Sequence, residues 1–100
     1  MGYLMYGNGP RIIIDDRLLR HVMVVCAVKL RHHETFLLEV VHSPREGAGR
    51  DAIWIAPSAP ILFHYKPATH DTLDTTLLDT LHKQADHGHL RITPRQGVIE

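Results

Sequence analysis

The hydrophobic and polar positions of this chain follow two different periods, which predict short strands arranged around one long amphipathic helix. Residues 17–31 keep apolar side chains at helical spacing, and Asp15 or Asp16 stands before them as a side-chain acceptor for the first helix amides. Cys26 falls inside this apolar run, so we expect it to be a small buried side chain. The pattern therefore predicts a helix from Asp15 or Asp16 to about Arg31.

Short β-like runs occur on both sides of that helix. Before it, the turn residues 7–10 separate two runs and predict a hairpin. After it, the Pro- and Gly-containing stretch 43–51 predicts an irregular hairpin loop, and two prolines force another reversal at 57–60, so three strands are expected to form a meander. We interpret Trp54, on one of these strands, as a core residue. The predicted strands are 3–6, 11–14, 35–41, 52–56, 61–65 and 90–93.

A second helix is predicted by four leucines that repeat at helical spacing between residues 73 and 81. Its expected start is Asp71 or Thr72, and its expected end is the stretch 87–89. The resulting order, ββ-α-βββ-α-β, predicts an α+β fold in which a mainly antiparallel sheet of about six short strands carries both helices on one face. At 100 residues, the chain is expected to form a single domain, residues 1–100.

Charge is balanced overall but unevenly distributed. The chain has 11 basic and 11 acidic residues. Residues 17–33 contain four arginines and lysines and no acid, whereas residues 71–86 contain four aspartates against one lysine. The two helices are therefore expected to be oppositely charged and able to attract each other.

The solvent-facing side of the first helix is the predicted binding surface. On a helical wheel, two valines lie among the charged residues outside the apolar face, which is typical of a contact surface. We therefore expect a small non-catalytic interaction or self-association module that forms a homodimer or binds a protein partner. The predicted partner-binding residues are Arg17, Arg20, His21, Val24, Val28 and Arg31.

An alternative function is nucleic-acid binding. In this interpretation, the helix arginines and the loop arginines contact phosphates together. The zero net charge weighs against it. The residues concerned are Arg17, Arg20, Arg31, Arg45 and Arg50.

Candidate chemistry is sparse in this sequence. His87 and His89 lie two residues apart beside Asp86 and are weak metal candidates, but a polar loop explains them better. The serines lack a neighbouring base and orienting group, so no catalytic residue and no cofactor is assigned. One cysteine, no signal-like start and no apolar run long enough for a bilayer predict a cytoplasmic protein that has no membrane partner.

Three segments, 15–40, 53–65 and 73–95, resemble a known family. They contain an acidic pair before the helix, a Lys-Leu-Arg helix end and a Trp-x-x-Pro-x-x-Pro turn at 54–60. These features are similar to a family of small actinobacterial proteins treated as a domain of unknown function, many of which are labelled "ATP-dependent DNA ligase". The chain departs from the family pattern at His32-His33, where Arg-Gly is common, and at Ala56, where a histidine is common.

The ligase label implies a lysine that accepts a nucleotide within a Lys-x-Asp-Gly motif. Lys29, Lys66 and Lys83 are followed by other residues, and no glycine-rich phosphate loop accompanies them. We therefore expect that this chain is not a ligase and not an enzyme.

Overall fold

The computed structural model describes residues 1–66, 72–95 and 97–98, and its elements follow the predicted order. A 3-10 turn, η1, and a short last strand, β7, are added to that order. The α+β class is confirmed. The elements are β1 (Gly2–Tyr6), β2 (Arg11–Ile14), α1 (Asp16–Arg31), β3 (Phe36–Val41), η1 (Pro44–Glu46), β4 (Arg50–Ile55), β5 (Ile61–His64), α2 (Thr75–Asp86), β6 (His89–Thr93) and β7 (Gly97–Val98).

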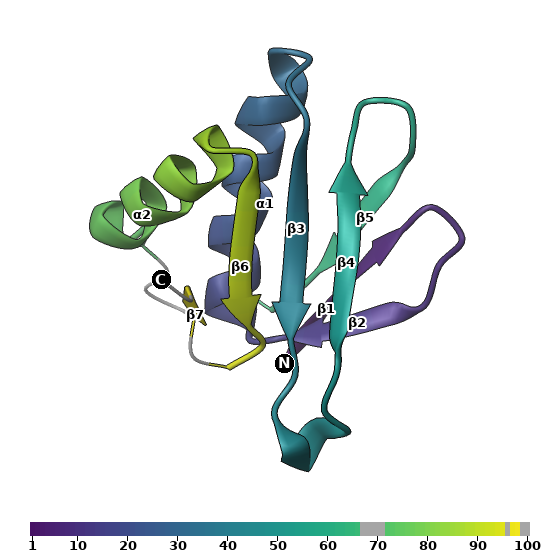
Figure 1. Cartoon of the computed structure of the whole chain (residues 1–100). Coiled ribbons are helices and arrows are strands. Elements are labelled where there is room, and N and C mark those ends of the chain that lie inside the picture. Colours follow the sequence, from purple (N-terminus) through teal and green to yellow (C-terminus); the bar gives the residue numbers. More distant parts are fainter. Residues whose placement is uncertain (67–71, 96, 99–100) are drawn as a thin grey trace.

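The strands form two sheets, so the expectation of one sheet is wrong. One sheet has the antiparallel order β2-β1-β5, and the other has the order β4-β3-β6-β7, in which β6 runs parallel to β3. Figure 1 shows the second sheet in front and the β2-β1-β5 sheet behind β4. The expected meander therefore stops after β4, because β5 pairs with β1.

The turn at 57–60 leads β5 to β1 rather than back to β4. Pro57 and Pro60 have no N–H to donate, so neither residue adds a ladder hydrogen bond to β4. The Pro60 carbonyl instead accepts the Gly7 N–H at 2.7 Å, and Ile61 then stands opposite Tyr6. The turn therefore positions β5 beside β1, where the two strands pair.

Both helices pack on the inner side of these sheets. α1 contacts β1 and β5, while α2 contacts α1, β6 and β3 (Figure 1). Buried apolar side chains from both sheets and both helices form one cluster, as expected for one domain. Its members are Leu4, Ile12, Ile14, Leu18, Leu19, Val22, Val25, Cys26, Phe36, Leu38, Val40, Ile55, Leu81, Ala85, Leu90 and Ile92.

Two predictions from local patterns are wrong, one about where a helix begins and one about the structure of a loop. α2 begins at Thr75 rather than at Thr72, because the Asp74 carboxylate accepts the N–H groups of Thr76 and Leu77 and so caps the helix. Asp71, the other predicted start, lies outside the described residues. The connection between β3 and β4 was expected to be irregular, yet it contains η1.

The prediction that Trp54 belongs to the core is also wrong, since its side chain is 57% exposed. β4 alternates strictly, so that Ile55 is buried and Trp54 points to the opposite side of the sheet. A fully apolar run such as 52–56 does not reveal which of its positions face inward.

Candidate functional site

The solvent-facing stripe of α1 lies where the sequence places it. Asp15 caps the helix by accepting the Leu18 N–H at 3.1 Å. Arg17 and Arg31 are exposed. Arg20, Val24 and Val28 are partly exposed on the same side. Among the described residues, the large exposed hydrophobic side chains all lie outside α1. The exposed surface of this stripe is therefore mainly polar.

His21 was expected beside this stripe, but it is fully buried, and the prediction that it contacts a partner is wrong. Its Nδ1 lies 2.6 Å from the Arg17 carbonyl, and its Nε2 accepts the Asp74 N–H at 2.9 Å. Because Nε2 accepts, the proton sits on Nδ1, which donates to the carbonyl. The start of α2 covers this imidazole, which ties the two helices together.

The charges of the two helices pair within the molecule, as their opposite signs predict. The Arg17 guanidinium lies 2.8 Å from the Asp74 carboxylate, and the Lys29 ammonium contacts both Asp86 and Glu34. Hydrogen bonds from the Leu77 N–H and then from Arg17 lower the pKa of Asp74. α1 is therefore clamped to both ends of α2.

Lys29 is the buried member of this clamp. Its hydrogen bond to Asp86, and then that to Glu34, raise the pKa of its amine, and Lys29 in turn lowers the pKa of Asp86. The amine is therefore an ammonium ion at neutral pH, without the lone pair that a nucleophile needs.

Three of the five arginines of the nucleic-acid alternative lie on α1, and the other two lie in η1 and β4. Arg17 and Arg31 lie at opposite ends of α1, about 21 Å apart at the helical rise. Arg50 pairs with Glu39 at 3.5 Å. Arg45 lies with Arg95 at a pocket beyond the ends of β3 and β6.

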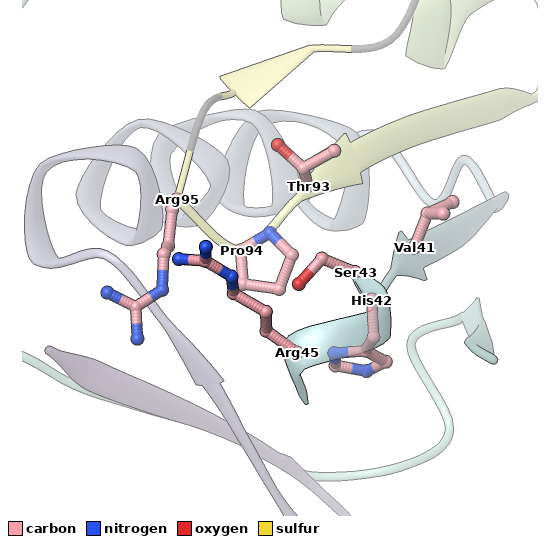
Figure 2. A pocket seen from close by; sticks show the side chains of 7 residues that line it. All are labelled: Val41, His42, Ser43, Arg45, Thr93, Pro94 and Arg95. Carbon is pink, nitrogen blue, oxygen red and sulfur yellow. The ribbon is translucent and has the colours of Figure 1, made fainter. Parts of the chain in front are cut away.

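That pocket has a volume of about 580 Å³ and is shown in Figure 2. Two chemically similar tripeptides form much of it, Ser43-Pro44-Arg45 after β3 and Thr93-Pro94-Arg95 at the end of β6. The sequence prediction missed Arg95. The sequence does repeat one pattern, Ser or Thr followed by Pro and Arg, at 43–45 and 93–95. The repeat indicates a shared site only once β3 and β6 are known to pair in parallel.

Two of the large exposed hydrophobic side chains, Ile13 and Leu62, lie on the β2-β1-β5 sheet. Residues that alternate with the buried ones point away from the core on all three strands. Register places Tyr3 between Ile13 and His64, and Met5 between Arg11 and Leu62. We call this surface the outer face, formed by Tyr3, Met5, Arg11, Ile13, Leu62 and His64.

The centre of the outer face is ordered by aromatic contacts. The rings of Tyr3 and His64 are stacked, with centroids 4.9 Å apart. The Arg11 guanidinium lies 4.5 Å from the centre of the Tyr3 ring. At the two edges, Ile13 and Leu62 remain 48% and 45% exposed. The outer face therefore combines rigid amphipathic side chains with exposed aliphatic ones.

The weak metal candidates are separated by their contacts. The His87 Nδ1 lies 2.7 Å from the Lys83 carbonyl, whereas the His89 Nε2 lies 3.5 Å from the Glu39 carboxylate. Within residues 1–66, 72–95 and 97–98, no three histidine, cysteine or acidic side chains gather as a metal site would require.

Cys26 is buried as expected, and burial raises the pKa of its thiol to about 12. The protonated thiol acts as a small core side chain. The described part of the chain also has no helix with the length and apolar character needed to cross a bilayer.

These features define a small α+β domain with a clamped helix pair, an apolar outer sheet face and a basic pocket. The chain belongs to the family named domain of unknown function DUF7882, whose model matches residues 1–95. No curated protein and no solved structure matches it significantly.

Proposed function

We propose that this domain is a non-catalytic interaction module that pairs with a second copy of itself through the outer face. The observation that carries the proposal is the exposure of Ile13 and Leu62 on opposite edges of one sheet face. This choice moves the interface from the stripe of α1, where the sequence pattern suggested it, to the three strands β1, β2 and β5.

The apolar pattern of these strands supports a covered outer face. β2 reads Arg-Ile-Ile-Ile and β5 reads Ile-Leu-Phe-His, so apolar residues point to both sides of the sheet. Near-continuous apolar strands are typical of sheets that are packed on both faces. Here the core covers only the inner face of the sheet. A partner would cover the other.

A second copy fits the chemistry of the outer face. Arg11 is its one arginine, lysine or acidic side chain, and it already rests on the Tyr3 ring. Little charge would therefore be desolvated in pairing. A two-fold axis near β1 would place the Ile13 edge of one copy against the Leu62 edge of the other, which makes the contact self-complementary.

The test is sedimentation velocity at tens of micromolar, on the wild-type chain and on three single variants. Ile13→Glu and Leu62→Glu should each raise the dimer dissociation constant about thirtyfold or more, as loss of an interface anchor does. Val24→Glu, on the stripe of α1, is the matched control and should leave it unchanged.

Two results would reject the proposal. A wild-type chain that remains monomeric at these concentrations removes self-association altogether. A dimer that Val24→Glu dissociates, and that Ile13→Glu leaves intact, returns the interface to the α1 stripe. Circular dichroism of each variant separates loss of pairing from loss of fold.

Nucleic-acid binding is not included in this proposal, because the net charge is zero and because Arg17 and Arg50 are paired with Asp74 and Glu39. Ligation is not included either. Its lysine motif is missing, and Lys29 is held as an ammonium ion. The proposal places the domain in the cytoplasm, as the sequence suggests.

A further inference from the structure

The pocket between the Ser43-Pro44-Arg45 and Thr93-Pro94-Arg95 segments has no part in the proposed pairing, and its chemistry is different. It lies beyond the carboxyl ends of β3 and β6, the two parallel neighbours in their sheet. In open sheets with parallel strands, ligands bind in the crevice outside the carboxyl ends of the strands. The location of this pocket is therefore one that is typical of ligand-binding sites.

The side chains around the pocket favour an anion. Arg45 and Arg95 both line it, and the hydroxyl groups of Ser43 and Thr93 lie on the same walls (Figure 2). Of the described side chains that line it, none is acidic. Guanidinium groups bind phosphate through paired, charge-assisted hydrogen bonds, and hydroxyl groups add further donors.

The walls of the pocket are held in place by backbone contacts. The Pro94 carbonyl accepts the Asp15 N–H at 2.7 Å, which fixes one wall to the start of α1. On the other wall, the Ser43 carbonyl accepts the Ala48 N–H at 2.9 Å, and the His42 N–H donates to the Gly49 carbonyl at 3.0 Å. The donors are therefore carried by a framework that is already ordered.

The size of the pocket indicates what carries the anion. Its volume of about 580 Å³ lies within the range of roughly 300 to 1,000 Å³ that small organic ligands occupy. Val41 and Pro94 add apolar surface to the polar wall. The geometry points to a binding site for a small organic phosphate monoester, with the phosphate between Arg45 and Arg95 and the organic part against Val41 and Pro94.

The test is a titration of the ¹⁵N-labelled full chain, followed by amide chemical shifts, with three probes. Inorganic phosphate tests the anion, AMP tests the phosphate monoester, and a single-stranded oligonucleotide with free 5′ and 3′ hydroxyl groups tests internal phosphodiesters. AMP should bind more tightly than phosphate, and the oligonucleotide should bind most weakly. The shifts should appear in the amides of His42, Ser43, Arg45, Thr93 and Arg95.

Variants then assign the site. Arg45→Gln and Arg95→Gln should each weaken AMP binding about tenfold or more, whereas Arg45→Lys, which keeps charge but loses the planar fork, should weaken it less. Arg31→Gln removes an exposed arginine at the far end of α1 and should leave AMP binding unchanged. The amide spectrum of each variant reports its fold in the same experiment.

Three results would overturn the inference. The first is the absence of shifts at these amides with millimolar phosphate and AMP. The second is equal weakening by Arg31→Gln and Arg45→Gln, which would indicate general attraction of polyanions. The third is binding of the oligonucleotide alone. None of these outcomes bears on the outer face, so the proposed self-association stands or fails separately.

Discussion

Replacing Asp86 with asparagine tests the clamp between the two helices. The Lys29 side chain is only 7% exposed, and it contacts the Asp86 and Glu34 carboxylates, which are 62% and 53% exposed. Asp86→Asn keeps the shape of the side chain but removes one of the two charges that neutralise Lys29. The buried ammonium ion then depends on Glu34 alone.

The expected loss lies between two limits. Exposed ion pairs contribute about 0 to 1 kcal/mol, whereas removing one partner of a buried pair costs about 3 to 5 kcal/mol. Here the Lys29 cation is buried, whereas its two carboxylate partners are exposed to water. In the variant, Lys29 also keeps its ion pair with Glu34. We therefore expect Asp86→Asn to lower the free energy of unfolding by an amount between these limits, which lowers Tm by several degrees for a domain of this size.

The assay is urea unfolding at neutral pH, with Asp79→Asn as the matched control. Asp79 also pairs with one lysine, Lys83, at 3.1 Å, but both side chains are exposed. This control should change stability by less than about 0.5 kcal/mol. In a Lys29→Met background, Asp86→Asn should cost almost nothing, because an aspartate at a helix C-terminus is unfavourable without a cation beside it.

The pH dependence gives an independent check. The pKa of Asp86 is lowered below its usual 3.8, so its contribution is present above that value and is lost as pH falls through the lowered one. The pKa of Lys29 is raised above its usual 10.5, so its contribution is full below that value and is lost as pH rises through the raised one. The wild type and Asp86→Asn should differ constantly between these limits and converge in strong acid. Equal effects of Asp86→Asn and Asp79→Asn, or a difference that persists in strong acid, would refute the clamp.

Three further predictions concern the core and its edges. His21→Phe should destabilise the domain by about 1 to 3 kcal/mol, because it removes the acceptor of the Asp74 N–H, and ¹⁵N spectra of the wild type should show the Nδ1–H tautomer. Cys26 should resist Ellman's reagent in the folded protein and react once urea unfolds it; rapid reaction of the native chain would contradict its burial. Gly2→Ala should cost about 1 to 3 kcal/mol in urea unfolding, because its Cβ would lie 2.2 Å from the His64 carbonyl oxygen, whereas Gly7→Ala meets no atom within 4 Å and pays only for its positive φ.

Local patterns in the sequence predicted the elements well, because each element carries its own start and stop signals. Asp15 caps α1 where its side chain and the following apolar spacing indicate. For α2, the sequence offered Asp71 and Thr72 as starts. Only the structure shows that the Asp74 carboxylate accepts the first helix N–H groups. Element order was therefore predictable, and boundaries were less so.

Pairing between distant segments could not be predicted from such signals. The contact of β5 with β1, and the parallel contact of β6 with β3, depend on interactions more than 50 residues apart in each register. His21 was misplaced for the same reason, because the start of α2 covers it. The outer face and the basic pocket are both created by these long-range pairings. The sequence pattern could show only the α1 stripe, because that surface lies within one helix.

Two basic residues of α1, Arg17 and Lys29, have a structural consequence inside the molecule. Asp74 and Asp86 tie the two ends of α2 to α1, and the chain then turns at Gly88, whose positive φ of 89° suits a glycine. The Gly88 carbonyl accepts the Leu37 N–H at 2.9 Å and so starts the parallel contact of β6 with β3. The position of α2 thus sets the register of β6, which carries Thr93-Pro94-Arg95 to the end of β3. Loss of the clamp should therefore loosen the basic pocket before it disturbs the outer face, which β1, β2 and β5 form without α2.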